Sequence, residues 1–274
     1  MNIAAANALP IGVFDSGVGG LTVLKAIREE LPQEDLIYLG DTARLPYGTK
    51  SPASISRYAC QATRQLQGQG IKLLVVACNT ASAVALDALR SQMEPLPVIG
   101  VVEPGAEAAV AARPAGSHLV LATEATVRLQ AYRHAIHARD PDAEVKELAC
   151  ELLVSLAEEG WTQGVIAEAI VRRYLDQVDP DHRADSVILG CTHFPLLRES
   201  IASALDHRVS IVDSASTTAS TVREQLESRE IVNNDNNAGH LRLLATDGAT
   251  RFARVGGLFL GHDLSASDVE IVDL

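Results

Sequence analysis

The chain has 274 residues, of which 47% are hydrophobic and 21% are charged, the composition of a globular protein with one large domain or two lobes. Its net charge of −12 disfavours nucleic acid as a partner, because binding to phosphates needs basic patches, and no apolar run is long enough to cross a bilayer. The opening MNIAAANALP lacks the pattern of a signal peptide, and the spacing of the four cysteines does not suggest a disulfide framework, so we expect a cytoplasmic protein.

Short apolar segments alternate with longer amphipathic ones along the chain. In chain order, the segments expected to form strands are 11–15, 35–41, 71–78, 97–102, 117–123, 186–191, 209–214, 241–246 and 269–274. Strands rich in Val, Ile and Leu that alternate with helices predict an α/β fold with parallel sheets flanked by helices. The polar stretch 228–240 is expected to be a surface loop.

Two of the intervening segments carry clear helix signals. LTVLKAIREEL places Leu21, Leu24, Ile27 and Leu31 on one face of a helix. A second helix is expected from 52 onward, because Ser51 is a suitable N-cap and Pro52 suits the first helical position.

The first strand ends in the motif IGVFDSGVGGLT. Asp15 closes the strand, and Gly17, Gly19 and Gly20 lead into the next helix, so the turn could direct backbone N–H groups at an anion. The motif is neither a P-loop nor a dinucleotide fingerprint, because the required spacings are missing. A plain tight turn with Asp15 as the helix cap remains the alternative.

A polar loop, YLGDTARLPYGTKS, follows the second strand. Pro46 and Gly48 suit an ordinary surface connection. The same residues, with Tyr47, also suit a loop at the mouth of a cleft, and both interpretations stay open.

Two cysteines stand where a strand ends and a helix begins, Cys78 in LVVACNTAS and Cys191 in VILGCTHFP. The positive end of the helix dipole is expected to lower the thiol pKa from about 8.5 towards neutrality. A single such cysteine would be interpreted as a small buried hydrophobe. Two in matched contexts favour a chemical role, whereas Cys60 and Cys150 lack this context and are assigned to packing.

The two cysteine motifs belong to a faint internal repeat. IGVFDSGVGG and LVLATEATV form a second pair, and the separation of Asp15 from Thr123 is similar to that of the cysteines. The repeat predicts two lobes of related build that direct the ends of their strands at one cleft, which is where ligands bind in open α/β sheets.

His193 lies two residues after Cys191 and could be a base partner, a metal ligand or a helix cap. A zinc site built from Asp15, Cys78, Cys191 and His193 is conceivable, but CxxC and HxxxH spacings are absent. A cysteine–histidine hydrolase would leave the second cysteine without a task. A zinc-dependent hydrolase therefore stays an alternative with weak support.

Two opposed thiols suit proton exchange at a carbon atom. One thiolate removes the α-proton of an amino acid, and the opposed thiol supplies a proton to the other face. The charge of the carbanion spreads onto the carboxylate and needs fixed donors. Suitable donors, besides the N–H groups of the turns, are the side chains of Ser16, Asn79, Thr80, Thr123 and Thr192.

The motifs DSGVGG, PYGTKS, ACNTAS and GCTHFPLL, in this order and spacing, resemble the glutamate racemase family of the cofactor-independent Asp/Glu racemase superfamily. The resemblance covers most of the chain. It implies two lobes with the active site in the cleft between them, and interconversion of L- and D-glutamate without cofactor or metal. It further implies a cytoplasmic homodimer that supplies D-glutamate for peptidoglycan, and hence for cell wall biogenesis and cell shape.

The resemblance also implies roles for individual residues. Cys78 and Cys191 would be the acid/base pair, with Asp15 assisting the first and His193 the second. Substrate contacts would come from Asp15, Ser16, Tyr47, Gly48, Asn79, Thr80, Thr123, Thr192 and His193. One lobe would hold residues 1–97 and 207–274, with Asp15 and Cys78. The other would hold residues 98–206, with Cys191 and His193.

One segment departs from the family pattern. Many relatives have a proline after the cysteine of ACELLVSLAEEG, where this chain has Glu151, and the auxiliary carboxylate would be Glu158. The nearest rival function is an aspartate or hydantoin racemase, against which His193 favours glutamate. A regulatory binding protein is a further alternative.

Overall fold

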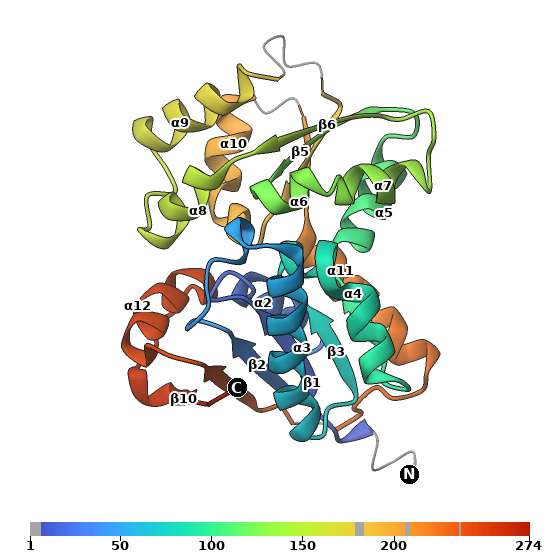
Figure 1. Cartoon of the computed structure of the whole chain (residues 1–274), viewed down its shortest axis with the longest axis vertical. Helices are drawn as coiled ribbons and strands as arrows, with labels where there is room; N and C mark the ends of the chain where they lie inside the picture. The colour runs from blue at the N-terminus through green and yellow to red at the C-terminus, as the bar shows by residue number, and fades with distance from the viewer. Residues whose placement is uncertain (1–6, 179–183, 206–208, 236) are drawn as a thin grey trace.

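The computed structural model describes residues 7–178, 184–205, 209–235 and 237–274. The chain forms two lobes, and each is a parallel β-sheet flanked by helices (Figure 1). The predicted α/β fold with two similar lobes is therefore confirmed. No helix within the described residues is long and apolar enough to span a membrane.

The sheet of the first lobe has the strand order β10-β9-β2-β1-β3-β4. Its strands are β1 (Ile11–Asp15), β2 (Leu36–Gly40), β3 (Leu73–Val76), β4 (Val98–Gly100), β9 (Leu241–Ala245) and β10 (Val269–Ile271). In the centre, β1 pairs in parallel with both β2 and β3, so that Ile11 lies opposite Leu36 on one side and Leu73 on the other.

The sheet of the second lobe has the strand order β6-β5-β7-β8. Its strands are β5 (Ser117–Ala122), β6 (Glu144–Ala149), β7 (Ser186–Gly190) and β8 (Ser210–Asp213). This order repeats β2-β1-β3-β4 of the first lobe, so β5 corresponds to β1 and β7 to β3. The internal repeat read from the sequence thus has a counterpart in topology.

The strands depart from the sequence prediction in two respects. Strand β6 was not predicted, because EVKELA carries three charges and lies at the edge of its sheet, where only Val145 and Leu148 are buried. In addition, Val98–Gly100 pairs with β3 in the first sheet, and Ser210–Asp213 pairs with β7 in the second. Strand β4 therefore belongs to the first lobe and β8 to the second, the reverse of what the predicted boundaries assign. The boundary between 206 and 207 itself falls outside the described residues.

Helices connect the strands and cover the sheets. The α-helices are α2 (Leu21–Glu30), α3 (Pro52–Gly68), α4 (Asn79–Met93), α5 (Val102–Ala112), α6 (Glu124–Arg128), α7 (Ala131–His137), α8 (Glu151–Glu158), α9 (Val165–Leu175), α10 (Arg198–Ala204), α11 (Ser214–Ser228) and α12 (Ala249–Leu260). Short 3₁₀ helices are η1 (Tyr47–Thr49), η2 (Phe194–Leu197) and η3 (Ala266–Asp268). Of the predicted loop 228–240, Ser228 is the last residue of α11, and the described residues from 231 to 240 form neither helix nor strand.

The predicted helix signals are present. Ser51 caps α3, its Oγ accepting a hydrogen bond from the backbone N–H of Ser54 at 3.3 Å, and Pro52 opens the helix. On α2, Leu21, Leu24 and Ile27 are buried. A Ser cap of this kind stabilises a helix by about 1 kcal/mol relative to alanine.

Strand β1 is buried on both faces, which explains why it reads as a continuous apolar run. Ile11 and Val13 belong to the same hydrophobic cluster as α2, α11 and α12, whereas Phe14 belongs to the cluster that contains α3 and α4. Each such buried side chain contributes roughly 1.5–3 kcal/mol to folding. The resulting three-layer packing fixes the ends of β1 and β3, where Asp15 and Cys78 are found.

Candidate active site

A small cavity, about 60 Å³ in volume, lies where the ends of strands from the two lobes meet. All of the predicted site residues except Asp15 line it. From the first lobe these are Ser16, Tyr47, Gly48, Cys78, Asn79 and Thr80, and from the second Thr123, Cys191, Thr192 and His193. Residues more than 100 positions apart in the sequence therefore converge on one space.

Asp15 lies at the end of β1, is 1% exposed, and does not line the cavity. Its Oδ2 accepts a hydrogen bond from the backbone N–H of Gly17 at 2.8 Å, and its Oδ1 has no hydrogen-bond partner among the described residues. Burial raises the pKa of this carboxyl, and the charge of His193 and backbone N–H groups oppose that rise. A Cβ on Gly20 would come within 2.6 Å of the Asp15 Cβ, so the glycine-rich turn folds around this carboxylate.

Cys78 is the N-cap residue of α4. Its Sγ accepts from the backbone N–H of Ala81 at 3.4 Å, and its thiol donates to Ser16 Oγ at 3.5 Å. Burial raises the pKa of Cys78 to about 12, and the charge of Asp15 adds to the rise, although the contacts with Ser16 and Ala81 act in the opposite direction. The expected fall in pKa towards neutrality is therefore wrong for Cys78, because desolvation outweighs the helix dipole.

Cys191 follows β7 and has a different neighbour. Its Sγ lies 3.8 Å from Nδ1 of His193, and Nε2 of His193 lies 3.2 Å from Oε1 of Glu158. Burial alone would lower the pKa of His193, but the hydrogen bonds with Cys191 and Glu158 raise it to about 10. The imidazole is therefore charged at neutral pH and places a positive charge beside the thiol.

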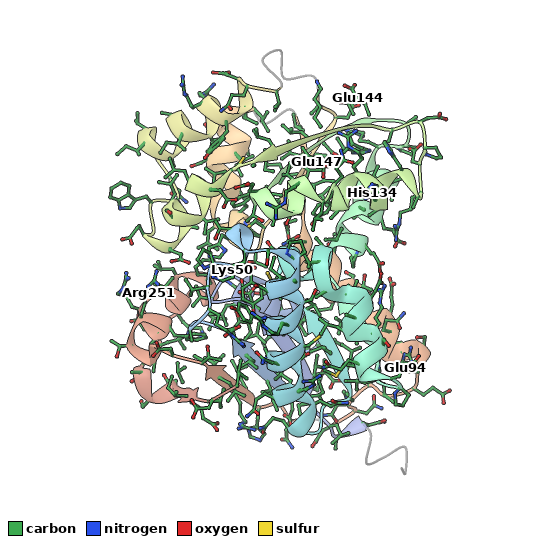
Figure 2. The ribbon with its side chains drawn as sticks, in the orientation of Figure 1. Lys50, Glu94, His134, Glu144, Glu147 and Arg251 are labelled. Atoms are coloured by element: carbon green, nitrogen blue, oxygen red, sulfur yellow. The ribbon has the colours of Figure 1, made fainter. Side chains whose placement is uncertain are left out.

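Glu158 connects this histidine to the other lobe. Its Oε2 accepts from Arg251 at 2.7 Å, and Arg251 lies on α12 of the first lobe, at the edge where the two lobes meet (Figure 2). The hydrogen bond with His193 is the main cause that lowers the pKa of Glu158. The carboxylate expected to be auxiliary thus contacts both a site histidine and the opposite lobe.

Other contacts hold the two lobes together at the cavity. Thr80 Oγ1 and Thr123 Oγ1 are 2.9 Å apart, and Thr22 Oγ1 donates to the carbonyl of Thr192 at 2.9 Å. A Cβ on Gly19 would overlap the side chain of Thr192, so glycine permits the close approach of the lobes at this turn.

The loop between β2 and α3 forms one wall of the cavity. Tyr47 is 1% exposed, and its hydroxyl donates to Asp41 Oδ2 at 2.5 Å. Asp41 also accepts from Arg44 and Thr246, so the loop is anchored by a buried carboxylate. Of the two interpretations of this loop, the structure supports a wall of the cleft, with Gly48 packed against Thr123.

Three lining residues were not predicted for the site: Pro46, Glu151 and Val154. Glu151 Oε1 accepts from the backbone N–H of Glu124 at 2.5 Å, and thus holds the start of α6 beside Thr123. The sequence shows that Glu151 is an unusual residue after Cys150. It does not show that Glu151 lies at the cavity, because the charged strand β6, which leads the chain there, is not predicted.

The conceivable zinc ligands do not form a metal centre. In the part of the chain that the structure describes, no group of three or more His, Cys, Asp or Glu side chains is arranged to hold a metal ion. The arrangement does place two thiols, one beside a carboxyl and one beside an imidazolium, on a cavity rich in hydroxyl and amide donors. These groups are suited to moving protons to and from a bound carbon acid.

Comparisons with known proteins agree with this chemistry. Residues 11–222 match the sequence model of the Asp/Glu/Hydantoin racemase family. A glutamate racemase of Geobacter metallireducens is 48% identical, with 93% of each chain covered. A glutamate racemase of Francisella tularensis, solved with D-glutamate, has a TM-score of 0.90 and 38% identity over 97% of this chain and 98% of its own. That of Thermus thermophilus, solved with β-chloro-D-alanine, has a TM-score of 0.87 and 41% identity, with 98% of each chain covered.

Proposed function

The chain belongs to the Asp/Glu/hydantoin racemase family, and from this premise we propose that it interconverts L- and D-glutamate with Cys78 and Cys191 as the two acid/base groups. The observation that carries the proposal is the cavity itself. Both thiols line it, each at the end of a strand that occupies the same place in the order of its own sheet.

The proposed reaction exchanges one proton for another at Cα. One cysteine, as thiolate, takes the α-proton, and the electron pair of the C–H bond remains on the substrate and spreads onto its carboxylate. The other cysteine, as thiol, then donates its proton to the opposite face. The product is the mirror image of the substrate, and the two cysteines have exchanged protonation states. In the reverse direction their roles are exchanged.

Fixed donors stabilise the negative charge of the intermediate. We assign substrate contact to Asp15, whose charge acts on Cys78, and to eight residues that line the cavity: Ser16, Tyr47, Gly48, Asn79, Thr80, Thr123, Thr192 and His193. Hydroxyl and amide groups already held in place stabilise developing charge without reorganisation. His193, charged at neutral pH, stabilises the thiolate of Cys191, and we assign Asp15 to assist Cys78.

The biological setting is part of the proposal. We infer a cytoplasmic homodimer that supplies D-glutamate for peptidoglycan, without cofactor or metal and without nucleic acid or membrane partners. The support is the identity to glutamate racemases over nearly the whole chain.

The central test uses purified protein after dialysis against a chelator. L-glutamate and D-glutamate are incubated separately without added cofactor, and optical rotation is followed. We expect both solutions to lose rotation and reach the same racemic end point. Activity that disappears on dialysis and returns only with zinc or pyridoxal phosphate would overturn the two-thiol mechanism.

Substrate choice needs its own comparison. We expect glutamate to be racemised faster than aspartate, because the anchored loop at Tyr47 and the GCTHFP turn bound the cavity and would contact the distal carboxylate. Turnover of L-aspartate that equals or exceeds that of L-glutamate would assign the chain to the rival substrate.

A further inference from the structure

Tyr132 is a buried tyrosine of the second lobe whose hydroxyl reaches into the first. It lies on α7 and is 0% exposed. Its hydroxyl donates to the side-chain oxygen of Asn79 at 2.7 Å. Asn79 is the first residue of α4, directly after Cys78, and it lines the cavity. Tyr132 itself does not line the cavity.

The hydrogen bond determines which way the Asn79 amide faces. The Tyr132 hydroxyl donates to the amide oxygen of Asn79, and burial raises the pKa of Tyr132, so the phenol keeps the proton that it donates. The oxygen of Asn79 is therefore held towards Tyr132, and the NH₂ group points away from it. That nitrogen is buried and has no hydrogen-bond partner among the described residues.

The NH₂ group of Asn79 is a buried donor beside the cavity without a partner in the described part of the chain, so we expect a bound ligand to supply its acceptor. Buried donors are costly to leave without a partner, and functional sites are where such donors persist. A carboxylate accepts hydrogen bonds only, so it matches an outward NH₂ group and would be repelled by an outward carbonyl oxygen.

The tyrosine ring cannot move aside easily, because two glycines enclose it. A Cβ on Gly190 would come within 2.9 Å of Cε2 of Tyr132, and a Cβ on Gly105 within 3.2 Å of Cε1. Gly190 is the last residue of β7 and precedes Cys191. Tyr132 therefore contacts the strand that carries one cysteine and holds the residue next to the other.

We propose that Tyr132 is a positioning residue for the reaction: it holds the Asn79 amide so that its NH₂ group binds the α-carboxylate of the amino acid. The inference rests on the proposed function. Because both enantiomers carry the same α-carboxylate, and the carbanion places more charge there, the contact serves both directions of the reaction and strengthens as the proton leaves.

The test combines Tyr132→Phe with Asn79→Ala, singly and together. We expect Tyr132→Phe to lower kcat/KM for glutamate about tenfold, and to weaken the binding of D-glutamate measured by calorimetry. In the Asn79→Ala background, Tyr132→Phe should have no further effect on either quantity, because the group through which it acts is gone.

Tyr174→Phe is the matched control. Tyr174 lies on α9, and its hydroxyl accepts from the backbone N–H of Leu152 at 3.2 Å; neither residue lines the cavity. This variant also loses one hydroxyl, and we expect its kcat/KM to stay within a factor of two of wild type. Melting temperatures of all variants show whether each is folded.

The possible results distinguish a failure of the role proposed for Tyr132 from a failure of the proposed function. A Tyr132→Phe protein with full kcat/KM and unchanged glutamate binding would overturn the proposal. An equal loss in both Asn79 backgrounds would also overturn it, because a merely structural role acts whether or not the amide is present. If wild type binds glutamate but does not racemise it, the proposed function fails, and the binding data alone decide the role of Tyr132.

Discussion

The two cysteine turns occupy equivalent places in the two lobes, yet they are built differently. Cys78 follows β3 and caps the long helix α4, so its sulfur accepts a backbone N–H. Cys191 follows β7, and the chain continues into the short 3₁₀ helix η2, whose N-cap residue is His193. The repeated topology delivers the same atom to the same cavity, while the local sequence decides what surrounds it.

The surroundings carry opposite charge. Cys78 lies in the field of the Asp15 carboxyl, which adds to the effect of burial and raises its pKa to about 12. Cys191 lies beside an imidazolium, because the pKa of His193 is raised to about 10. The comparison teaches that one repeated strand order can place two thiols on the same cavity in surroundings of opposite charge.

Thermodynamics limits where this asymmetry can be observed. The two enantiomers of glutamate have equal free energy, so kcat/KM is the same in both directions for any variant. Differences between the two thiols must therefore be measured in a half-reaction that uses only one of them. Elimination from a β-chloroalanine enantiomer is such a reaction, because loss of the α-proton and of chloride needs no second proton donor at Cα.

The largest effect is expected from replacing either cysteine by serine. A hydroxyl is far too weak an acid to become the base that the reaction needs near neutral pH, whereas an ordinary thiol has a pKa of about 8.5. Cys78→Ser and Cys191→Ser should each lower racemisation about 10²–10⁴-fold in both directions. Each should retain elimination, with opposite preference for the enantiomers of β-chloroalanine, measured as pyruvate release.

Two results would contradict this prediction. Near-wild-type racemisation by both variants would remove the cysteines from the mechanism. Preference for the same enantiomer by both variants would mean that the thiols do not act on opposite faces. Melting curves of both variants provide the control for folding.

The next effect concerns the reactivity of the two thiols in the resting protein. Cys78 and Cys191 are 5% and 6% exposed, so access is similar and charge should decide. We expect iodoacetamide to label Cys191 at least about tenfold faster than Cys78 at pH 7.5, because burial and the Asp15 charge raise the pKa of Cys78, whereas Cys191 lies beside the His193 imidazolium. His193→Asn should remove most of the difference, as measured by peptide mapping. Equal labelling of both thiols in wild type would contradict the charge assignment.

Much of this site could be predicted from the sequence, because the signals lie in short stretches of neighbouring residues. A strand that ends at a cysteine, followed by Asn-Thr or Thr-His, places these side chains at the strand end whatever the rest of the fold does. The same holds for Ser51, whose capping depends only on its neighbours. Parallel order then brings the ends of β1 and β3, or of β5 and β7, side by side.

The features that escaped prediction depend on distant parts of the chain. The pKa of Cys78 is set by burial and by Asp15, which is far away in sequence, so the helix dipole alone gave the wrong direction. Tyr132 reads as an ordinary core residue in AYRHAIH, because its partner Asn79 belongs to the other lobe. Strand β6 carries charges that suit an edge strand but hide it from a search for apolar runs.

A smaller effect is expected in the pH dependence of stability. A histidine whose pKa is raised from 6.5 in the unfolded chain to about 10 in the fold stabilises the protein when it is charged. That contribution is fully present below about pH 6.5, declines as pH rises from there, and is gone above about pH 10. His193→Asn should therefore destabilise the protein by roughly 2 kcal/mol near pH 6, and the difference should shrink towards pH 10.

Urea unfolding of wild type and His193→Asn at pH 6, 8 and 10 measures this difference. In the variant, the partly buried carboxylate of Glu158 keeps its contact with Arg251. A difference in unfolding free energy that stays constant, or grows, between pH 6 and 10 would show that His193 is not charged in the fold.

The smallest effect is expected at the two cysteines outside the cavity. It tests whether a position at the end of a strand is enough to give a thiol a role in proton transfer. Cys150 follows β6, just as Cys78 follows β3, but it is 0% exposed, does not line the cavity, and its thiol donates to the carbonyl of Leu148 at 3.5 Å. Burial raises the pKa of Cys150, which keeps it protonated.

Cys150→Ser should cost about 1 kcal/mol of stability, because a hydroxyl is buried in place of a thiol. Cys60→Ser should cost less, because Cys60 is only half-buried. Both variants should racemise glutamate within a factor of two of wild type and keep the wild-type ratio of chloride elimination between the two enantiomers of β-chloroalanine. A loss confined to one enantiomer in Cys150→Ser would instead assign this third thiol to proton transfer, since packing damage alone cannot distinguish one face of the substrate from the other.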